Sequence, residues 1–248
     1  LWFDSLEYSK PFKTVLFSVV GFSSLGLVLA IIFTYILTNK IKQEVQRSII
    51  SPLIPVGLFG ASWGALSWDI YLKYINRVST GVSEPLFGLD TGFYLFSLPF
   101  LVNIFQFLLI VVILNLAWLL LVQVDDKLLA RYQSRCVGTL FLILAFGSFL
   151  AGFNLIYSDF GVVKGAGWTD INIRLPMHYV FVIIFTISGI ILLTPVVYTK
   201  IQNWVSRKYH FYKIEKYKSH RQVRFSIPAA LIVSWLVLTG VLPILVQW

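Results

Sequence analysis

The sequence predicts an all-α integral membrane protein, a bundle of six transmembrane helices with both chain ends on the extracytoplasmic side. Of its 248 residues, 58% are apolar and only 12% are charged, whereas an average soluble domain is about 25% charged. The mean hydropathy is +0.81, which excludes intrinsic disorder. The single cysteine, Cys136, excludes a disulfide-stapled secreted module. A soluble globule of this length could not bury so much apolar surface, so we place most of the chain in lipid.

Six apolar windows are long enough to span a bilayer, which takes about 20 residues. They cover residues 12–37, 53–74, 98–122, 137–157, 177–198 and 226–246. None alternates in the manner of a membrane β-strand, so each is predicted to be a helix. Prolines, which suit the first turn of a helix, mark four of the starts: Pro52 and Pro55, Pro99, Pro176, and Pro228. Pro195 is expected to kink the fifth helix or end it early. We predict one transmembrane domain over residues 1–248, with no internal repeat.

The charges of the connecting segments predict the orientation. Residues 39–51, 123–136 and 199–225 share one side of the membrane and carry fourteen basic and four acidic residues. The opposite side has a net charge near zero. Because basic residues concentrate in cytoplasmic loops, the first side is predicted to be cytoplasmic, and both chain ends then lie outside. An outside N-terminus suggests that an earlier helix and a true start precede Leu1, so we expect this chain to be a fragment of a longer one.

The segment 199–225 holds eight of the basic residues. We interpret it as a juxtamembrane segment lying on anionic lipid at the cytoplasmic face, worth about 1 kcal/mol per basic residue near the surface. Docking to a cytoplasmic partner and RNA binding are the weaker alternatives, and we expect no nucleic-acid partner. The predicted lipid contacts are Arg207, Lys208, Lys213, Lys216, Lys218, Arg221 and Arg224.

Two polar residues inside apolar windows are candidate functional groups, because polar groups in a membrane are costly. Asp69 lies toward the outer end of its window and can pair with Lys73 at i+4; the alternative is a proton or cation ligand. Asn115 lies deeper, and we expect an interhelical hydrogen bond there. In addition, Gly60 and Gly64 form a G-x-x-x-G pattern, which lets helix backbones approach closely.

The two outer loops are unusually apolar and rich in glycine, and they carry the main candidate residues. The first, residues 81–100, needs a surface on which its aromatic rings can rest. The second, residues 157–170, turns sharply beside a tryptophan. Their acidic residues could meet around a hard cation such as calcium, although turn and capping bonds are the commoner use. The candidates are Glu84, Phe87, Gly88, Asp90, Phe93, Tyr94, Asp159, Gly165, Gly167, Trp168, Thr169 and Asp170.

The sequence lacks a phosphate-binding loop, a zinc-protease motif, a Cys-x-x-Cys pair and a nucleophile elbow. We therefore predict no catalytic residues, no metal site and no cofactor beyond bound lipid. A bound pigment stays an open alternative, because chlorophyll needs only one ligand and aromatic packing. The absence of these motifs favours a protein that is not an enzyme, and the sequence leaves that question undecided.

Both loops resemble the motifs of a known family. Residues 81–100 resemble its F-G-V-x-D-P-x-F-G-x-D-x-x-F-Y-x-F-x-L-P-F, and residues 155–176 its L-x-Y-S-x-x-G-x-V-x-G-A-G-Y-T-D-x-x-x-x-L-P. Glu84 stands where the family has Asp, and Trp168 where it has Tyr. The family is an uncharacterised class of conserved bacterial and archaeal membrane proteins (UPF class). The resemblance implies seven N-terminal transmembrane helices followed by a large extracytoplasmic domain, with this chain as helices two to seven.

These observations favour a membrane-embedded scaffold or anchor that presents an extracytoplasmic domain or serves as an accessory subunit of a larger membrane complex. The expected partners are the bilayer and either other membrane subunits or the chain's own extracytoplasmic domain. A transporter or channel subunit is the alternative, and it would need a polar path past Asp69 and Asn115. An outer-face membrane enzyme using Asp90, Asp159 or Asp170 is the second alternative. The expected location is the prokaryotic plasma (inner) membrane, or the thylakoid membrane in a cyanobacterium.

Overall fold

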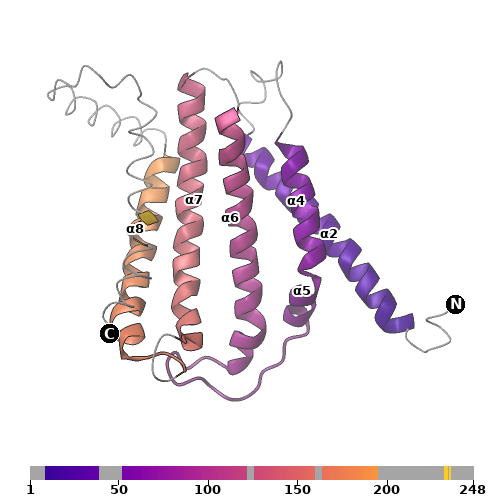
Figure 1. Ribbon diagram of the computed structural model, residues 1–248, viewed down its shortest axis with the longest axis vertical. Coiled ribbons are helices and arrows are strands. Elements are labelled where there is room, and N and C mark those ends of the chain that lie inside the picture. Colours follow the sequence, from indigo (N-terminus) through magenta and orange to yellow (C-terminus); the bar gives the residue numbers. More distant parts are fainter. Residues whose placement is uncertain are drawn as a thin grey trace. The chain divides into compact units, whose positions relative to one another are not determined.

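The computed structural model describes residues 9–38, 52–121, 126–159 and 164–194, together with residues 232, 233 and 235. These residues form helices joined by turns and one isolated β-bridge, with no extended sheet among them. They group into two compact units, Leu1–Cys136 and Val137–Trp248, and each unit is described by itself (Figure 1). The prediction of a helix over 226–246 and of lipid contacts in 199–225 falls outside the described residues, apart from three positions.

The first unit contains most of the helices. They are α2 (Ser9–Thr38), α4 (Leu53–Leu66), α5 (Trp68–Ile75), the π-helical turn η1 (Phe93–Ser97), α6 (Leu98–Leu121) and the beginning of α7 (Asp126–Asn154). The predicted helices at 12–37 and 98–122 are confirmed as α2 and α6, because long apolar runs leave the backbone no alternative to internal hydrogen bonds.

The prediction of a single helix over 53–74 is wrong in one respect, because the helix is divided at Ser67. The backbone there leaves helical geometry, with φ −101° and ψ 6°. The buried Ser67 hydroxyl accepts a hydrogen bond from Asn103 of α6 at 2.9 Å, and Asn103 also accepts one from the Trp63 indole at 3.1 Å. This polar link from a distant helix holds α4 and α5 on either side of the break.

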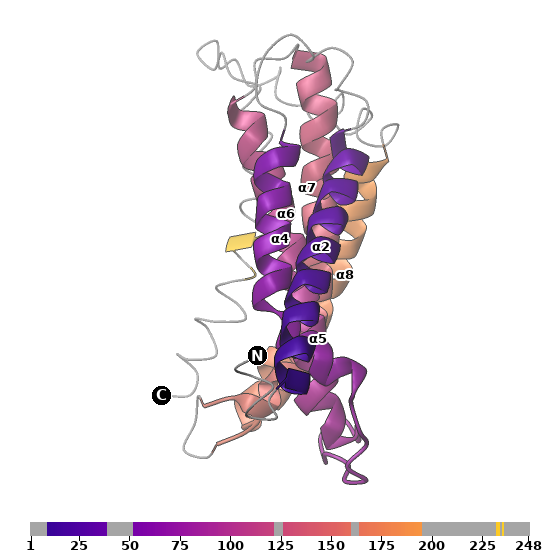
Figure 2. The ribbon, with the colours of Figure 1, turned by 90° about the vertical axis from the view of Figure 1, so that its right-hand side faces the viewer.

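Helices α2 and α4 pack with their backbones in contact (Figure 2). A Cβ atom on Gly60 would lie 2.5 Å from the Ala30 Cβ and overlap the Gly26 carbonyl, and one on Gly64 would overlap the Phe22 carbonyl. The G-x-x-x-G pattern of α4 therefore lies at a close helix contact, as predicted, and Gly26 is its partner on α2. Next to this contact, Ala30 packs with the buried side chains Val56, Phe107 and Val111 in an apolar cluster.

The second unit contains the rest of α7, the 3-10 turn η2 (Leu155–Tyr157), the π-helical turn η3 (Asp170–Arg174) and α8 (Leu175–Leu193). Helices α7 and α8 also approach through glycines, since a Cβ atom on Gly189 would lie 2.9 Å from the Gly138 carbonyl oxygen. Ser148 of α7 donates to the His178 carbonyl of α8 at 3.2 Å. These contacts place small and polar residues where the two helices meet.

The ends of these two helices differ from the predicted windows of 137–157 and 177–198. Helix α7 begins earlier, at Asp126. Its first turns contain polar residues, so they fell outside the apolar window from which the helix was predicted. Helix α8 ends at Leu193, and Thr194 is extended with φ −90° and ψ 104°. A residue that precedes proline disfavours helical geometry, so Pro195 ends this helix early, as one of the two predicted outcomes.

Four stretches of helix among the described residues are long and apolar enough to cross a membrane, namely Ser9–Thr38, Phe93–Leu119, Tyr132–Tyr157 and Asp170–Leu193. Helix α4 is apolar but shorter, because the break at Ser67 divides the predicted window. The predicted all-helical class thus holds for the described residues, whereas the count of six spans and the sides of the chain ends stay predictions. The single domain over 1–248 also stays a prediction.

Candidate functional site

The two loops predicted to lie outside keep the name outer loops, and the first of them forms a small hairpin between α5 and η1. Its two arms are joined at the bridge between Ser83 and Asp90, and by the bond from the Glu84 N–H to the Leu89 carbonyl at 2.8 Å. Gly88 closes the turn with φ +68°, and Gly81 begins the hairpin with φ +72°. Residues with a Cβ rarely adopt positive φ, so the turn depends on these glycines.

Asp90 organises this loop through its carboxylate. The carboxylate accepts hydrogen bonds from the Ser79 hydroxyl, from the N–H and hydroxyl of Thr80 at 3.2 and 3.0 Å, and from the Gly81 N–H at 3.1 Å. It also accepts the Gly92 N–H at 2.6 Å, which makes Asp90 the N-cap of the helix beginning at Thr91. Asp90 is thus already engaged within the loop, which argues for a structural role.

These bonds favour the charged form of Asp90. The hydrogen bond from Ser79, followed by those from the backbone N–H groups of Thr80 and Gly92, lowers the pKa of Asp90 well below its ordinary value. A group whose pKa is lowered by folding contributes stability above its unfolded pKa and loses it as the pH falls toward the folded value. The loop is therefore expected to be held at neutral pH and to loosen in acid.

Substituting Asp90→Asn should loosen the hairpin at neutral pH, because the amide can accept fewer and weaker hydrogen bonds than the carboxylate. We expect faster hydrogen exchange at the N–H groups of Thr80, Gly81 and Gly92, measured by mass spectrometry of the full-length protein. Exchange at these amides should also rise in the unsubstituted protein as the pH is lowered, after correction for intrinsic rates. Asp159→Asn, a change at an exposed residue of the other loop, is the control. Unchanged exchange in the Asp90 variant would contradict the assignment.

Glu84 ties the tip of the hairpin to the following helix. Its carboxylate accepts the N–H groups of Leu86 and Phe87 at 2.6 and 2.8 Å, and the Tyr94 hydroxyl at 3.3 Å. Tyr94 is buried, and its ring meets that of Phe93 edge to face with centroids 5.2 Å apart. The aromatic residues of this loop therefore rest partly on one another, while Val78, Val82 and Leu95 stay 65%, 61% and 58% exposed.

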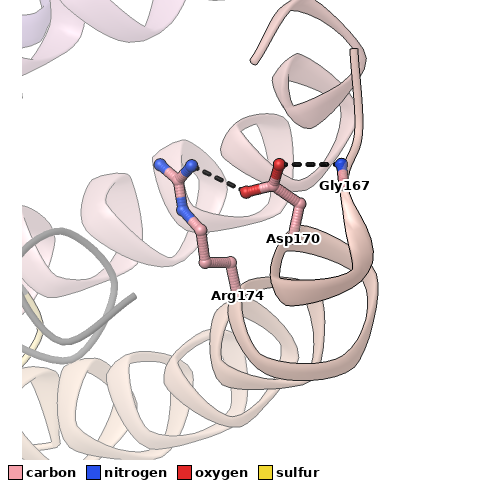
Figure 3. A network of polar contacts seen from close by, with 3 residues as sticks. All are labelled: Gly167, Asp170 and Arg174. Atoms are coloured by element: carbon pink, nitrogen blue, oxygen red, sulfur yellow. Dashed lines mark hydrogen bonds and ion pairs between the residues drawn. The ribbon is translucent and has the colours of Figure 1, made fainter. Parts of the chain in front are cut away.

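The second outer loop is centred on a buried ion pair (Figure 3). Asp170 is fully buried, and it accepts a hydrogen bond from the Arg174 guanidinium at 2.9 Å and one from the Gly167 N–H at 3.0 Å. The loop turns at Gly165, where φ is +110°. Of the other candidates here, Thr169 is buried, whereas Trp168 is 71% exposed.

The two loops lead into their helices in the same way, which the sequence analysis missed. In each, a glycine with positive φ stands eleven residues before the proline of a Leu-Pro pair. Gly88 precedes Pro99 in the first loop, and Gly165 precedes Pro176 in the second. Between them the helix widens into one π-turn, where the Leu98 N–H bonds to the Phe93 carbonyl and the Leu175 N–H to the Asp170 carbonyl.

The reason for this shared geometry is proline. Proline has no N–H to donate, and its ring clashes with the carbonyl four residues earlier in a regular helix. A π-turn just before the Leu-Pro pair moves that carbonyl away. The signal in the sequence was the fixed spacing between glycine and proline, which is visible only when the two loops are aligned on their Leu-Pro pairs.

The four acidic candidates of the loops are not brought together within either unit. Glu84 and Asp90 hold the first hairpin, Asp170 pairs with Arg174, and Asp159 is exposed. Among the described residues, no three His, Cys, Asp or Glu side chains lie close enough together to hold a metal ion. The calcium alternative, which needs acidic residues from both loops, stays a prediction.

The two candidates inside apolar helices have partners of the expected kinds. Lys73 pairs with Asp69 at 3.2 Å on the exposed side of α5, as the i+4 spacing predicted. Asn115 is fully buried in α6, and its Nδ2 donates to the Thr34 hydroxyl of α2 at 3.1 Å and to the Val111 carbonyl at 2.8 Å. The interhelical bond predicted for Asn115 is confirmed, while a role of either residue in transport stays a prediction.

Comparison with known proteins identifies relatives that match most of the chain. The pattern of the uncharacterised protein family UPF0182 matches residues 37–248. A UPF0182 protein of Trichlorobacter lovleyi is 31% identical over 229 residues, which cover 77% of this chain and 26% of that protein. A UPF0182 protein of the archaeon Methanospirillum hungatei is 28% identical over 234 residues, again 77% and 26%. The chain thus spans about a quarter of the length of these relatives. No solved structure matches it.

Proposed function

This chain belongs to the uncharacterised protein family UPF0182, and from that premise we propose that it is a membrane-embedded scaffold that presents an extracytoplasmic domain of the same polypeptide. The observation that carries the proposal is how the acidic side chains of the outer loops are bonded. The acidic side chains that could have bound a ligand, Glu84, Asp90 and Asp170, are used to hold the loops themselves. The first loop also exposes the apolar side chains Val78, Val82 and Leu95, among exposed polar residues such as Ser79 and Thr80.

The membrane part of the proposal is supported by the helices. Large apolar side chains lie exposed along them, including Phe17 of α2 at 71%, Leu58 of α4 at 64% and Ile183 of α8 at 59%. Contiguous apolar surface of this kind is costly in water and costs nothing in lipid. We propose six spans with the basic segments inside, in the plasma membrane of a prokaryote, and the basic residues of 199–225 on anionic lipid.

The docking part is supported by the first hairpin. Val78, Val82 and Leu95 lie on or beside it and are more than half exposed, and we name these three side chains the loop patch. The hairpin itself is held by many hydrogen bonds, so the loop patch is displayed on a fixed backbone. A fixed apolar surface outside the membrane is suited to a protein partner. Since about three quarters of each matched relative lies outside the region shared with this chain, the polypeptide's own remaining part is the partner we propose.

Site-specific photo-crosslinking in native membranes tests this function. A photoreactive amino acid at Val82 or Leu95 of the full-length protein should crosslink to peptides from the extracytoplasmic part of the same chain. The control is the same amino acid at Ile183, which is 59% exposed on an apolar helix and should react with lipid. Crosslinks from the loop patch to other membrane proteins would favour the accessory-subunit form of the proposal. Crosslinks to lipid alone at both loop positions would overturn it.

A transporter or channel subunit is the second candidate, and one observation favours it. The Asn115 Oδ1 atom is buried without a hydrogen-bond partner among the described residues, which is unusual in an apolar helix. An outer-face enzyme is less well supported, because Asp90 and Asp170 already accept several hydrogen bonds and only Asp159 is exposed.

A further inference from the structure

A layer of polar side chains lies buried in the first unit, near the ends of α2 and α6. It contains Thr34, Thr38, Asn115 and Tyr132, each at most 8% exposed. Two polar atoms of this layer, the Asn115 Oδ1 and the Tyr132 hydroxyl, have no hydrogen-bond partner among the described residues. One such atom in a domain is common, but two that lie against the same end of α2 need an explanation.

Contacts along α2 connect these two atoms. Asn115 of α6 donates to the Thr34 hydroxyl at 3.1 Å. One turn further along α2, the Thr38 hydroxyl donates to the Thr34 carbonyl at 2.9 Å, and the Tyr132 hydroxyl of α7 lies next to Thr38 but outside hydrogen-bond geometry. The unpartnered atoms of Asn115 and Tyr132 therefore flank the same two turns of α2.

Leaving such groups unpaired is expensive. A buried polar atom without a partner costs about 1–3 kcal/mol, and α2 and α6 pair closely elsewhere. One turn from Thr34 and from Asn115, Ala30 and Val111 belong to a fully apolar cluster. The chain thus changes from dry packing to a polar layer within one turn, which is the arrangement found where water enters a protein interior.

We infer that this layer is a binding site for ordered water, shared by Asn115 and Tyr132. The unpartnered atoms are an amide oxygen that accepts and a hydroxyl that both donates and accepts. A metal cation would need acceptors alone, and an anion would need donors alone. Water matches a neutral, mixed set of this kind, because it donates two hydrogen bonds and accepts two. The inference is independent of the scaffold proposal, since it rests only on buried contacts inside the first unit.

A double-mutant cycle tests whether the two residues share the site. Asn115→Leu and Tyr132→Phe remove one polar group each and are made singly and together in the full-length protein. If water connects them, their effects on the unfolding equilibrium constant should deviate from additivity by at least about twofold, the low end for residues in one hydrogen-bond network. The control pair is Asn115→Leu with Ser148→Ala, because Ser148 bonds to His178 instead. That pair should be additive.

Radiolytic labelling in ¹⁸O-enriched water tests for the water itself. Tyr132 and Phe141 are both on α7 and both 2% exposed, and their labelling is compared after correction for the higher intrinsic reactivity of a phenol ring. Tyr132 should be labelled well above Phe141, and its labelling should fall in the Asn115→Leu variant. The inference requires both results. Additive effects of Asn115→Leu and Tyr132→Phe would overturn it, and so would labelling of Tyr132 at the level of Phe141.

Discussion

Replacing Arg174 by leucine is expected to destabilise the second unit by about 3–5 kcal/mol, the usual cost of breaking a buried ion pair by removing one partner. Asp170 is fully buried, and its Oδ1 accepts the guanidinium hydrogen bond at 2.9 Å. Without Arg174, a carboxylate would stay buried with the Gly167 N–H as its one remaining hydrogen-bond donor among the described residues. The free energy of unfolding of the full-length protein in detergent, from denaturant titration, measures this loss.

The double variant Asp170→Asn with Arg174→Leu separates this explanation from simple loss of packing. It removes both charges, and replacing a buried pair by uncharged groups is often nearly neutral. We therefore expect the double variant to recover most of the stability lost in Arg174→Leu. A matched surface pair is available in Lys73 and Asp69, both well exposed; Lys73→Leu should cost less than about 1 kcal/mol. A double variant no more stable than Arg174→Leu would show that the charge is not the cause.

Adding one methyl group at Gly64 should separate α2 from α4. A Cβ atom there would overlap the Phe22 carbonyl and lie 3.1 Å from the Ser23 Cα. These are backbone atoms, so they cannot move aside as a flexible side chain would. Overpacking of this kind costs about 1–3 kcal/mol, and we expect Gly64→Ala to reach at least the middle of that range. Unfolding in detergent measures the stability, and disulfide crosslinking between cysteines on α2 and α4 reports whether the two helices have moved apart.

Gly21→Ala is the matched control, on α2, the helix that Gly64 of α4 packs against. A Cβ atom at Gly21 would meet nothing within 4 Å, so this change should stabilise the protein by about 0.4–1 kcal/mol through the unfolded chain. A loss of stability in Gly64→Ala and a gain in Gly21→Ala would show that backbone contact, and not helix propensity, decides the effect of the added methyl group. Equal effects at the two positions would contradict the close packing of α2 and α4.

Much of the fold was predictable because it depends on neighbouring residues. An apolar run of about 20 residues must satisfy its backbone internally wherever it is buried in protein or lipid, so α2 and α6 could be located from the sequence. The same holds for the end of α8, since Pro195 acts on Thr194 directly. Pairs at i+4, such as Asp69 with Lys73, also follow from helix geometry alone.

Other features depended on residues far apart in the sequence. The break at Ser67 is linked to Asn103, 36 residues away, and no local property of 53–74 marks it. Asp90 was predicted as a possible ligand, but its carboxylate is engaged by Ser79 and Thr80 across the hairpin. The glycine pattern of α4 predicted a close contact without naming its partner, which is Gly26 of α2.

The sequence by itself determined the helical class, the positions of most helices, and membership in a family through the two loop motifs. Those properties follow from hydrophobic length, proline and glycine placement, and charge, all of which are read along the chain. Only the tertiary structure decided how Asp90, Asp170 and Asn115 are used. The free energy of a polar group depends on whether a partner reaches it in a buried place, and that partner is supplied by the fold.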